Sequence, residues 1–190
     1  MDKKNVMIVV GSPRKNGNSS ALAKMVAAGV RAARAEVETF YLRDLKIKPC
    51  TACDYCRKKS RPGCILKDDM QKLYLKMREA DAIVIASPIY WFTISAQTKL
   101  FLDRWYALGG EEGYGLAGKR FGILLTYEDA DPFVSGAVNA LRTFQDIIGY
   151  VGAEITGMVY GSAGRAGEIR KNKKVLAAAY DLGKRLTANA

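Results

Sequence analysis

Val6-Met7-Ile8-Val9-Val10, followed by Gly11-Ser12-Pro13-Arg14-Lys15-Asn16-Gly17-Asn18-Ser19-Ser20, is the stretch of sequence that decides the fold. Its first half is a continuous apolar run, which is typical of a strand covered on both faces in a parallel sheet. Its second half is a polar loop that leads into a helix, because apolar residues then recur at three- and four-residue spacings from Leu22 to Ala33. Ser19 or Ser20 is placed to cap the first turn of that helix. The stretch therefore predicts a strand, a loop and a helix in succession.

The same alternation of short apolar runs and longer helical patterns continues along the chain. Further strands are expected at residues 37–42, 82–86, 121–126 and 155–160, and further helices at residues 68–77, 96–108, 131–149 and 167–187. Five strands that alternate with five helices predict an α/β fold, a doubly wound parallel sheet with helices on both faces. No linker divides the sequence, so residues 1–190 are expected to form a single domain with an insertion at about residues 46–66.

The charge of the chain is strongly basic, with 30 Lys and Arg residues against 19 Asp and Glu residues and a net charge of +11. Such a charge attracts an acidic protein, a phosphorylated cofactor or nucleic acid. The basic residues gather at 46–61 and 165–174 without a recognised DNA-reading motif, so nucleic-acid binding is not expected. The chain has no histidine, and acid–base chemistry near neutral pH would therefore need a perturbed group or a cofactor.

The distribution of apolar residues argues against a membrane protein and against a secreted one. No apolar run approaches the roughly 18 residues of a membrane span. Charged residues at the start of the chain run directly into the first apolar strand, where a secretory segment would have a longer apolar core. The expected location is a reducing cytoplasm.

The loop at residues 11–20 has the composition of a phosphate-binding site. Hydroxyl and amide side chains, free backbone N–H groups, the positive end of a helix dipole and Arg14 are together what a phosphate monoester needs. The loop lacks the patterns GxGxxG and GxxxxGKS/T, which argues against a dinucleotide site and against a nucleoside triphosphatase. The alternative is a polar turn capped by serine. The position after the first strand favours phosphate, because ligands bind beyond the carboxyl ends of the strands in such sheets.

Three successive aromatic residues, Tyr90, Trp91 and Phe92, follow the third expected strand. Core packing would explain one such residue, but adjacent side chains point in different directions, so it does not explain three in a row. Large aromatic side chains at the ligand edge of a sheet can border a flat ring system, while nearby backbone groups bind its polar edge. We therefore expect a planar ligand at this edge.

The four cysteines of the chain lie close together in sequence, at Cys50, Cys53, Cys56 and Cys64. Thiolates select iron-sulfur clusters or zinc over hard cations. Zinc sites with four thiolates usually use two separated C-x2-C knuckles. Here three cysteines follow one another with two residues between each pair, which favours a [4Fe-4S] cluster. Zinc, and free or oxidised thiols, stay open as alternatives. The neighbouring basic residues are placed to offset the charge of a cluster or to form a solvated loop face, and they are Arg57, Lys58, Lys59 and Arg61.

Two groups of motifs give the sequence a family resemblance. Residues 11–14 and 18–19 of the first loop, together with Ser87-Pro88-Ile89-Tyr90-Trp91, resemble the NADPH-dependent FMN reductase branch of the flavodoxin-like superfamily. The cysteine motif before Ile65-Leu66-Lys67-Asp68-Asp69-Met70 resembles the iron-sulfur flavoproteins within that branch. The likeness spans nearly the whole chain, and it implies a flavodoxin-like five-stranded sheet in the order 2-1-3-4-5.

The resemblance also implies two cofactor sites, for FMN and for a [4Fe-4S] cluster. The residues implied to hold the FMN phosphate or shape its loop are Ser12, Arg14, Asn16, Gly17, Asn18, Ser19 and Ser20. Those implied to border the isoalloxazine are Pro88, Ile89, Tyr90, Trp91 and Phe92, with Thr126 and Tyr127 added from the loop after strand four. That loop reads Thr126-Tyr127-Glu128-Asp129, where the family often has small or glycine-rich residues. The implied metal ligands are Cys50, Cys53, Cys56 and Cys64, and no side chain is expected to be catalytic because the flavin carries the chemistry.

The function implied by the resemblance is an FMN-dependent oxidoreductase that carries an iron-sulfur cluster. It would couple a one-electron donor, such as an acidic ferredoxin, or NAD(P)H to a small-molecule two-electron acceptor, and the basic surface fits an acidic ferredoxin by electrostatic steering. The alternative is an FMN-only NAD(P)H-dependent reductase of quinones, nitro compounds or azo compounds, with redox-active or vestigial cysteines. The resemblance also implies a homodimer or homotetramer.

Overall fold

The computed structural model describes residues 3–58 and 63–188, and its centre is a parallel sheet. The parallel strands are β1 (Asn5–Val10), β2 (Glu36–Tyr41), β3 (Ala82–Tyr90), β7 (Arg120–Tyr127) and β8 (Glu154–Ser162). Their order across the sheet is β2-β1-β3-β7-β8, which is 2-1-3-4-5 when only these strands are numbered. This is the flavodoxin-like order, and it confirms the predicted α/β fold.

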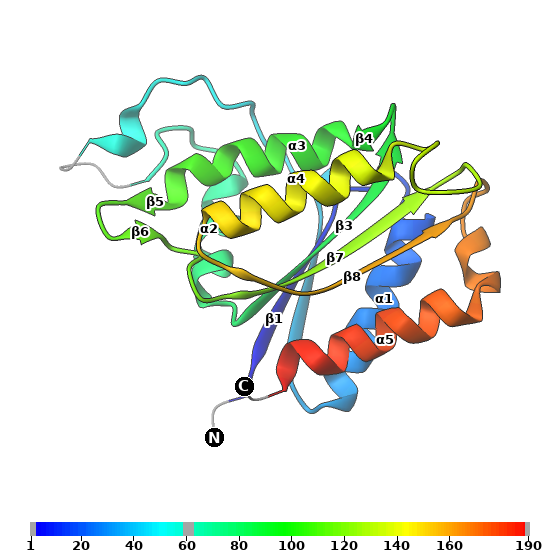
Figure 1. The fold of residues 1–190 in the computed structure, drawn as a ribbon. Coiled ribbons are helices and arrows are strands. Elements are labelled where there is room, and N and C mark those ends of the chain that lie inside the picture. The colour runs from blue at the N-terminus through cyan, green and yellow to red at the C-terminus, as the bar shows by residue number, and fades with distance from the viewer. Residues whose placement is uncertain (1–2, 59–62, 189–190) are drawn as a thin grey trace.

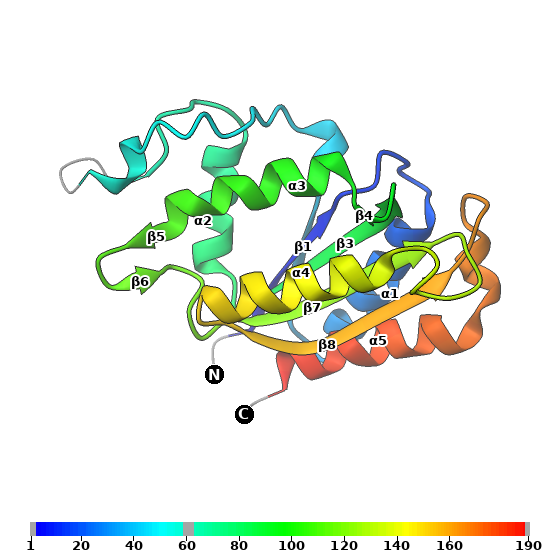
Figure 2. The same cartoon turned by 45° about the horizontal axis from the view of Figure 1, so that its top comes forward.

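Helices cover both faces of the sheet, as the sequence predicted (Figure 1). One face carries α1 (Asn18–Ala32) and α5 (Lys173–Thr187), and the other carries α2 (Met70–Glu79), α3 (Ala96–Asp103) and α4 (Ala137–Tyr150). Figure 2 shows the two helix layers on either side of the strands. Successive side chains of a strand point to opposite faces, so the apolar run of β1 is shared between the two cores.

Short elements that the sequence did not predict lie at the ends of the main ones. β4 (Thr93–Ile94) pairs antiparallel with the end of β3, and β5 (Gly109–Gly110) pairs with β6 (Gly113–Tyr114) in a separate small hairpin. A loop was expected at residues 87–93, but residues 87–90 form the last part of β3, which is longer than predicted. The 3₁₀ helices are η1 (Leu42–Asp44), η2 (Tyr55–Arg57), η3 (Arg104–Leu108) and η4 (Glu168–Lys171).

Several predicted helix boundaries were wrong. Ser19 and Ser20 do not cap α1 but lie inside it, after Gly17. The helix expected from residue 131 begins at Ala137, because residues 131–136 form turns in which the Asp131 carboxylate accepts hydrogen bonds from two backbone N–H groups. The helix expected at 96–108 continues after α3 as η3, and the one expected at 167–187 is divided between η4 and α5.

The predicted core positions are mostly buried. Met70, Leu73, Tyr74 and Met77 of α2 all face the sheet, as their spacing predicted. The apolar spacing of the first helix and of the helix expected at 167–187 predicts Ala33 and Ala178 on core faces, but both are exposed. Ala33 is exposed because α1 has already ended at Ala32. None of the helices in the described part of the chain combines the length and the apolar character needed to span a bilayer.

The helices α1 and α5 approach each other closely at two glycines. A Cβ atom added to Gly29 would collide with the carbonyl group of Tyr180, and one added to Gly183 would collide with the carbonyl oxygen of Val26. The absence of side chains at these positions therefore allows the backbones of α1 and α5 to pack directly against each other.

The turn between β3 and β4 has an unusual composition for its shape. Tyr90 pairs with Thr93, so Trp91 and Phe92 alone form the loop, and both have positive φ, at 52° and 67°. A two-residue loop of this kind normally uses Asn-Gly or similar residues, because bulky side chains are strained in the left-handed region. The side chain of Trp91 is 92% exposed, so little buried surface offsets this strain.

Replacing Trp91 and Phe92 by Asn and Gly is expected to raise the free energy of unfolding by about 1–2 kcal/mol, since both residues tolerate positive φ. Urea unfolding of the double variant measures the gain. The matched control replaces both residues by alanine, which removes the rings but keeps a Cβ atom at each position. A double Asn-Gly variant no more stable than the alanine pair would show that the turn is not strained.

Candidate functional site

An open groove lies at the carboxyl ends of the parallel strands. Four segments from separate parts of the chain meet there, namely the loop after β1, the end of β3, the end of β7 and the residues after β8. The predicted site residues that line the groove are Ser12, Arg14, Asn18, Ser19, Pro88, Ile89, Tyr90, Thr126 and Tyr127. The topology therefore brings together residues that the sequence assigned to one ligand from three distant motifs.

The loop after β1 is held in a fixed turn by its own hydrogen bonds. The carbonyl oxygen of Arg14 accepts from the N–H of Gly17 at 3.0 Å and from the hydroxyl of Ser20 at 3.1 Å. The hydroxyl oxygen of Ser12, which is buried, accepts from the N–H of Arg14 at 3.1 Å. The exposed side chain of Arg14 and the first N–H groups of α1 are left at the groove, which is the donor set that a phosphate group requires.

The start of α1 is tied to the two strands on the other side of the groove. The hydroxyls of Ser19 and Thr126 share a buried hydrogen bond of 2.8 Å. The side-chain amide of Asn18 donates to the carbonyl oxygens of Ala163 and Arg165, both at 3.0 Å, and its oxygen accepts from the N–H of Ile169. These bonds fix the width of the groove at its polar end.

Some predicted site residues do not line the groove. Gly17 and Ser20 shape the loop behind it, and Asn16 is exposed on the outer side of the turn. Trp91 and Phe92 form the tip of the β3–β4 hairpin and are not among the residues that line the groove. The sequence reasoning did not assign Glu128, Ala163 and Gly164, which complete the groove. The small residues that follow the fifth strand were the available signal, because that strand ends at the same edge of the sheet.

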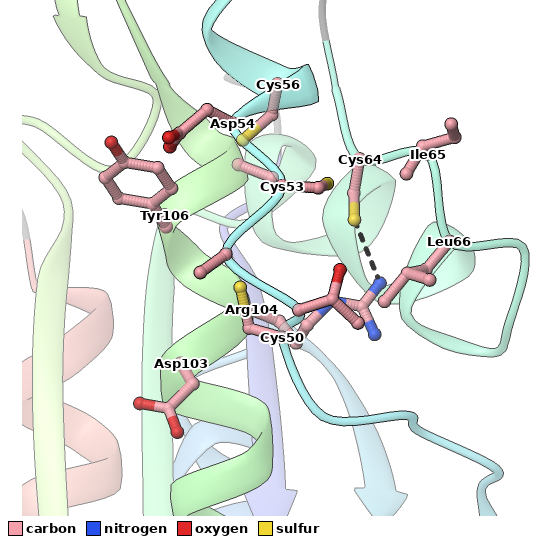
Figure 3. A pocket seen from close by; sticks show the side chains of 13 residues that line it. Cys50, Cys53, Asp54, Cys56, Cys64, Ile65, Leu66, Asp103, Arg104 and Tyr106 are labelled. Atoms are coloured by element: carbon pink, nitrogen blue, oxygen red, sulfur yellow. Dashed lines mark hydrogen bonds between the residues drawn. The ribbon is translucent and has the colours of Figure 1, made fainter.

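A second, smaller pocket is lined by all four cysteines. Cys50 and Cys53 are exposed, while Cys56 and Cys64 are partly buried and pack against the core. Figure 3 shows the four sulfur atoms bordering the same opening, with Asp103, Arg104 and Tyr106 on the side formed by α3 and η3. The insertion therefore folds back on the body of the domain and presents its thiols toward it.

The cysteine segment uses left-handed backbone positions to reach this arrangement. Ala52 and Asp54, which flank Cys53, have φ values of 50° and 52°. Backbone hydrogen bonding from Tyr55 lowers the pKa of the exposed Cys53 thiol, whereas burial raises the pKa of Cys56. Non-glycine residues at positive φ are strained and are concentrated at functional sites, which fits a segment shaped for a ligand.

The basic residues beside the cysteines have mixed roles. The guanidinium of Arg57 lies 3.8 Å from the ring centre of Tyr106 and donates to the hydroxyl of Tyr114, so it stacks on the domain surface. Lys58 is exposed, and Lys59 and Arg61 lie outside the described residues. Arg57 therefore joins the cysteine segment to the β5–β6 hairpin, a role that the sequence did not predict.

The donor set of the second pocket is four thiols, which are the ligands of iron-sulfur clusters and of zinc. Within residues 3–58 and 63–188, no three Cys, Asp, Glu or His side chains converge closely enough to hold one metal ion. Arg104 also lines this pocket, and its buried Nε has no hydrogen-bond partner in the described structure. The four thiols and this unsatisfied donor are consistent with an anionic group in the pocket.

A comparison with known protein families covers most of the chain. The profile of the NADPH-dependent FMN reductase family matches residues 4–153. This range contains all four cysteines and every residue that lines the groove except Ala163 and Gly164. The chain belongs to the NADPH-dependent FMN reductase family. Membership places it among flavin oxidoreductases that use FMN, and it confirms the predicted enzyme class.

Relatives of this FMN reductase family member fall into two groups. An iron-sulfur flavoprotein of Archaeoglobus fulgidus is 35% identical over 119 residues, which cover 63% of this chain and 52% of the relative. This chain thus spans about half the length of the first iron-sulfur flavoproteins that it matches. YwqN of Bacillus subtilis, provisionally named an NAD(P)H-dependent FMN-containing oxidoreductase, is 27% identical over 187 residues. The alignment covers 96% of this chain and 98% of YwqN.

Solved structures extend the similarity to the fold. An NAD(P)H:quinone oxidoreductase from Methanothermobacter marburgensis superimposes with a TM-score of 0.78 at 18% sequence identity. The superposition covers 100% of this chain and 98% of the other. This family member therefore shares the whole architecture with that oxidoreductase.

Proposed function

We propose that this chain is an iron-sulfur flavoprotein that binds FMN in the groove and a [4Fe-4S] cluster on Cys50, Cys53, Cys56 and Cys64. The observation that carries the proposal is that all four cysteines line one pocket in a domain of the FMN reductase family. When bound, FMN exchanges one or two electrons and a cluster exchanges one, so the protein would couple one-electron donors to two-electron acceptors.

The residues of the groove have distinct tasks in this proposal. Arg14 and the N–H groups at the start of α1 would bind the phosphate, and Asn18 and Ser19 hold that end of the groove in place. Pro88, Ile89 and Tyr90 would border the ring system, with Tyr127 on the side of β7. Burial raises the pKa of Tyr127, so its phenol stays protonated near neutral pH.

The two pockets are joined through α3. The N-cap residue of α3, Ser95, donates to the carbonyl oxygen of Gly11 at 2.6 Å, at the beginning of the phosphate loop. Directly after α3, Arg104 and Tyr106 line the cysteine pocket. The helix has eight residues and a length of about 12 Å, so it acts as a short rigid spacer between the two sites.

Anaerobic purification followed by flavin, iron and sulfide analysis tests this proposal. One FMN and about four irons per chain, after reconstitution where needed, are expected. The Cys64→Ser variant is expected to keep its flavin and lose iron, and it serves as the matched control. Wild-type protein that binds FMN but takes up no iron under strictly oxygen-free reconstitution would contradict the cluster and leave the flavin site intact.

The second candidate function is an FMN-only NAD(P)H-dependent reductase of quinones, nitro compounds or azo compounds. It is favoured by the match to the Bacillus protein, which extends over nearly the full length of both chains. Rapid anaerobic bleaching of the visible flavin band by NADPH or NADH, in protein that is free of iron, would support this function. Slow reduction by both nucleotides, with fast reduction by a ferredoxin, would support the first.

The remaining partner proposals rest on the surface. Exposed Lys48, Lys58 and Lys67 belong to the cysteine insertion and its flanks, which supports an acidic protein such as a ferredoxin as electron donor. Exposed Trp91, Phe92, Phe133 and Val134 support a homodimer or homotetramer. Sedimentation velocity of the purified chain measures the subunit number, and a monomer at all concentrations would contradict this part of the proposal. The cytoplasmic location stays a prediction.

Substituting Arg14 by alanine is expected to weaken FMN binding about 10-fold to 100-fold while leaving riboflavin binding nearly unchanged, because only FMN carries the phosphate. Fluorescence titration of both flavins gives the two ratios. Lys15→Ala is the matched control, since it removes a positive charge from the same loop at a side chain that pairs with Asp44 instead of lining the groove. Equal losses for FMN and riboflavin would contradict the phosphate role of Arg14.

A further inference from the structure

Arg104 is a buried cation at the edge of the cysteine pocket, and the function proposed above gives it no role. Its side chain is 1% exposed, and its partner Asp68 is 3% exposed. The Nη1 group donates to Asp68 at 2.6 Å and to the carbonyl oxygen of Lys48 at 2.8 Å. The Nη2 group donates to Asp68 at 3.3 Å and to the sulfur of Cys64 at 3.4 Å, as the dashed line in Figure 3 shows.

These bonds join the two segments that flank the cysteine segment, around Lys48 and Asp68, which we call the neck of the insertion. Lys48 lies two residues before the first cysteine, and Asp68 lies four residues after the last one. Asp68 also accepts a hydrogen bond from the N–H of Lys48 at 2.9 Å, so Arg104 and Asp68 together hold the two segments of the neck against each other. The side-chain amide of Gln71 further fixes the second segment, because it donates hydrogen bonds to the carbonyl oxygens of Cys64 and Leu66.

The body of the domain holds Arg104 rigidly. Its carbonyl oxygen accepts from the buried hydroxyl of Tyr74 at 2.9 Å. The next residue, Trp105, packs edge-on against Phe101 with ring centres 5.6 Å apart, and its ring centre is 5.7 Å from that of Phe121. Position and direction of the guanidinium are therefore set by the core, and the cysteine segment is fixed against it.

We infer that Arg104 is a positioning residue for the cysteine pocket, which holds Cys64 in place for a cluster and donates a hydrogen bond to its sulfur. The inference rests on the proposed cluster. An N–H donor to a ligating sulfur stabilises the more negative, reduced state of a cluster, so Arg104 would raise its reduction potential. The guanidinium suits this task because one planar group reaches Asp68, the Lys48 carbonyl and Cys64 at once.

Two variants separate this role from a merely structural one. Arg104→Lys keeps a positive charge opposite Asp68, but a single ammonium group cannot make the same set of bonds. The double variant Arg104→Met with Asp68→Leu removes both charges together, so no buried charge is left without a partner. Arg142→Met is the matched control, because it removes an arginine from an exposed ion pair with Asp146 on α4.

The experiment uses the anaerobically reconstituted full chain. The measurements are the midpoint potential of the cluster by electron paramagnetic resonance, the iron affinity by chelator competition, and urea unfolding of the iron-free protein. Both Arg104 variants are expected to fold, to bind iron about 10-fold to 100-fold more weakly, and to have a lower potential than the control. A variant that folds like the control yet retains no iron at all also supports the positioning role.

Different results would contradict the proposed cluster and the role of Arg104. Wild-type protein that takes up no iron would overturn the cluster and this inference together. Wild-type protein with a cluster, and Arg104 variants whose midpoint potential equals that of the control, would overturn this inference alone and leave the proposed function standing.

Discussion

The Asp68→Ala variant is expected to unfold with a free energy about 3–5 kcal/mol below that of the wild type, because it leaves the buried guanidinium of Arg104 without its counter-charge. The carboxylate accepts two hydrogen bonds from that group and further ones from the N–H groups of Lys48 and Met70. Its loss would therefore also open the neck of the cysteine insertion. Urea unfolding of the iron-free protein measures the effect.

The control for this prediction is an ion pair of the same kind on the surface. The Nε group of Arg142 donates to both carboxylate oxygens of Asp146, at 2.8 and 2.9 Å, but the two side chains are 76% and 59% exposed. Asp146→Ala is expected to change the free energy of unfolding by about 0.5 kcal/mol or less, because water screens exposed pairs. Equal effects of the two substitutions would show that the Asp68 pair is not buried in solution.

The same pair gives the stability a pH dependence of known sign. Burial alone would raise the pKa of Asp68, but the hydrogen bonds from Arg104 and from the N–H of Lys48 outweigh it and lower the pKa below the ordinary value of 3.8. The stabilisation is therefore complete above that value and is lost as the pH falls through the lower pKa of the folded state. Below about pH 4, the free energy of unfolding should therefore fall less steeply with decreasing pH in Asp68→Ala than in the wild type.

The Gly29→Val variant is expected to lower the free energy of unfolding by about 3 kcal/mol, because a side chain at this position forces α1 and α5 apart. The obstacle is the backbone carbonyl of Tyr180, which cannot move aside as a flexible side chain would. Thermal or urea unfolding measures the loss.

The matched control for the helix contact is Gly149→Ala in α4. A Cβ atom at Gly149 meets nothing within 4 Å, so this substitution is expected to stabilise the protein by about 0.5–1 kcal/mol through helix propensity. Opposite signs for the two glycines would confirm that the contact between α1 and α5 depends on Gly29. A neutral Gly29→Val variant would show that these helices are not in direct backbone contact.

The parts of the fold that were predictable from the sequence are those that depend on local patterns. The apolar runs of β1, β3 and β7 identified central strands, and because parallel strands end at one edge, their following residues were expected to meet there. The hairpin at Trp91 and Phe92 was not predictable, because these residues contradict the usual turn chemistry. Its shape is supported from elsewhere, by the side chain of Asn139, which donates to the carbonyl oxygen of Phe92 at 3.1 Å.

The cysteine pocket shows the same division between local and distant information. The spacing of the four cysteines was sufficient to group them, but nothing near them in sequence indicated how the insertion is anchored. Arg104 lies 40 residues beyond Cys64, within a stretch that reads as an amphipathic helix with Phe101, Trp105 and Leu108 on its apolar side. A buried arginine on such a face becomes recognisable only when its partner Asp68 is seen in three dimensions.

An anaerobic crystal structure of the FMN-loaded chain, with anomalous data collected at the iron edge, tests the central claim most directly. The account predicts one compact iron peak enclosed by Cys50, Cys53, Cys56 and Cys64. It also predicts a flavin whose phosphate lies between Arg14 and the start of α1. A flavin bound away from this groove, or iron bound away from the four cysteines, would contradict it.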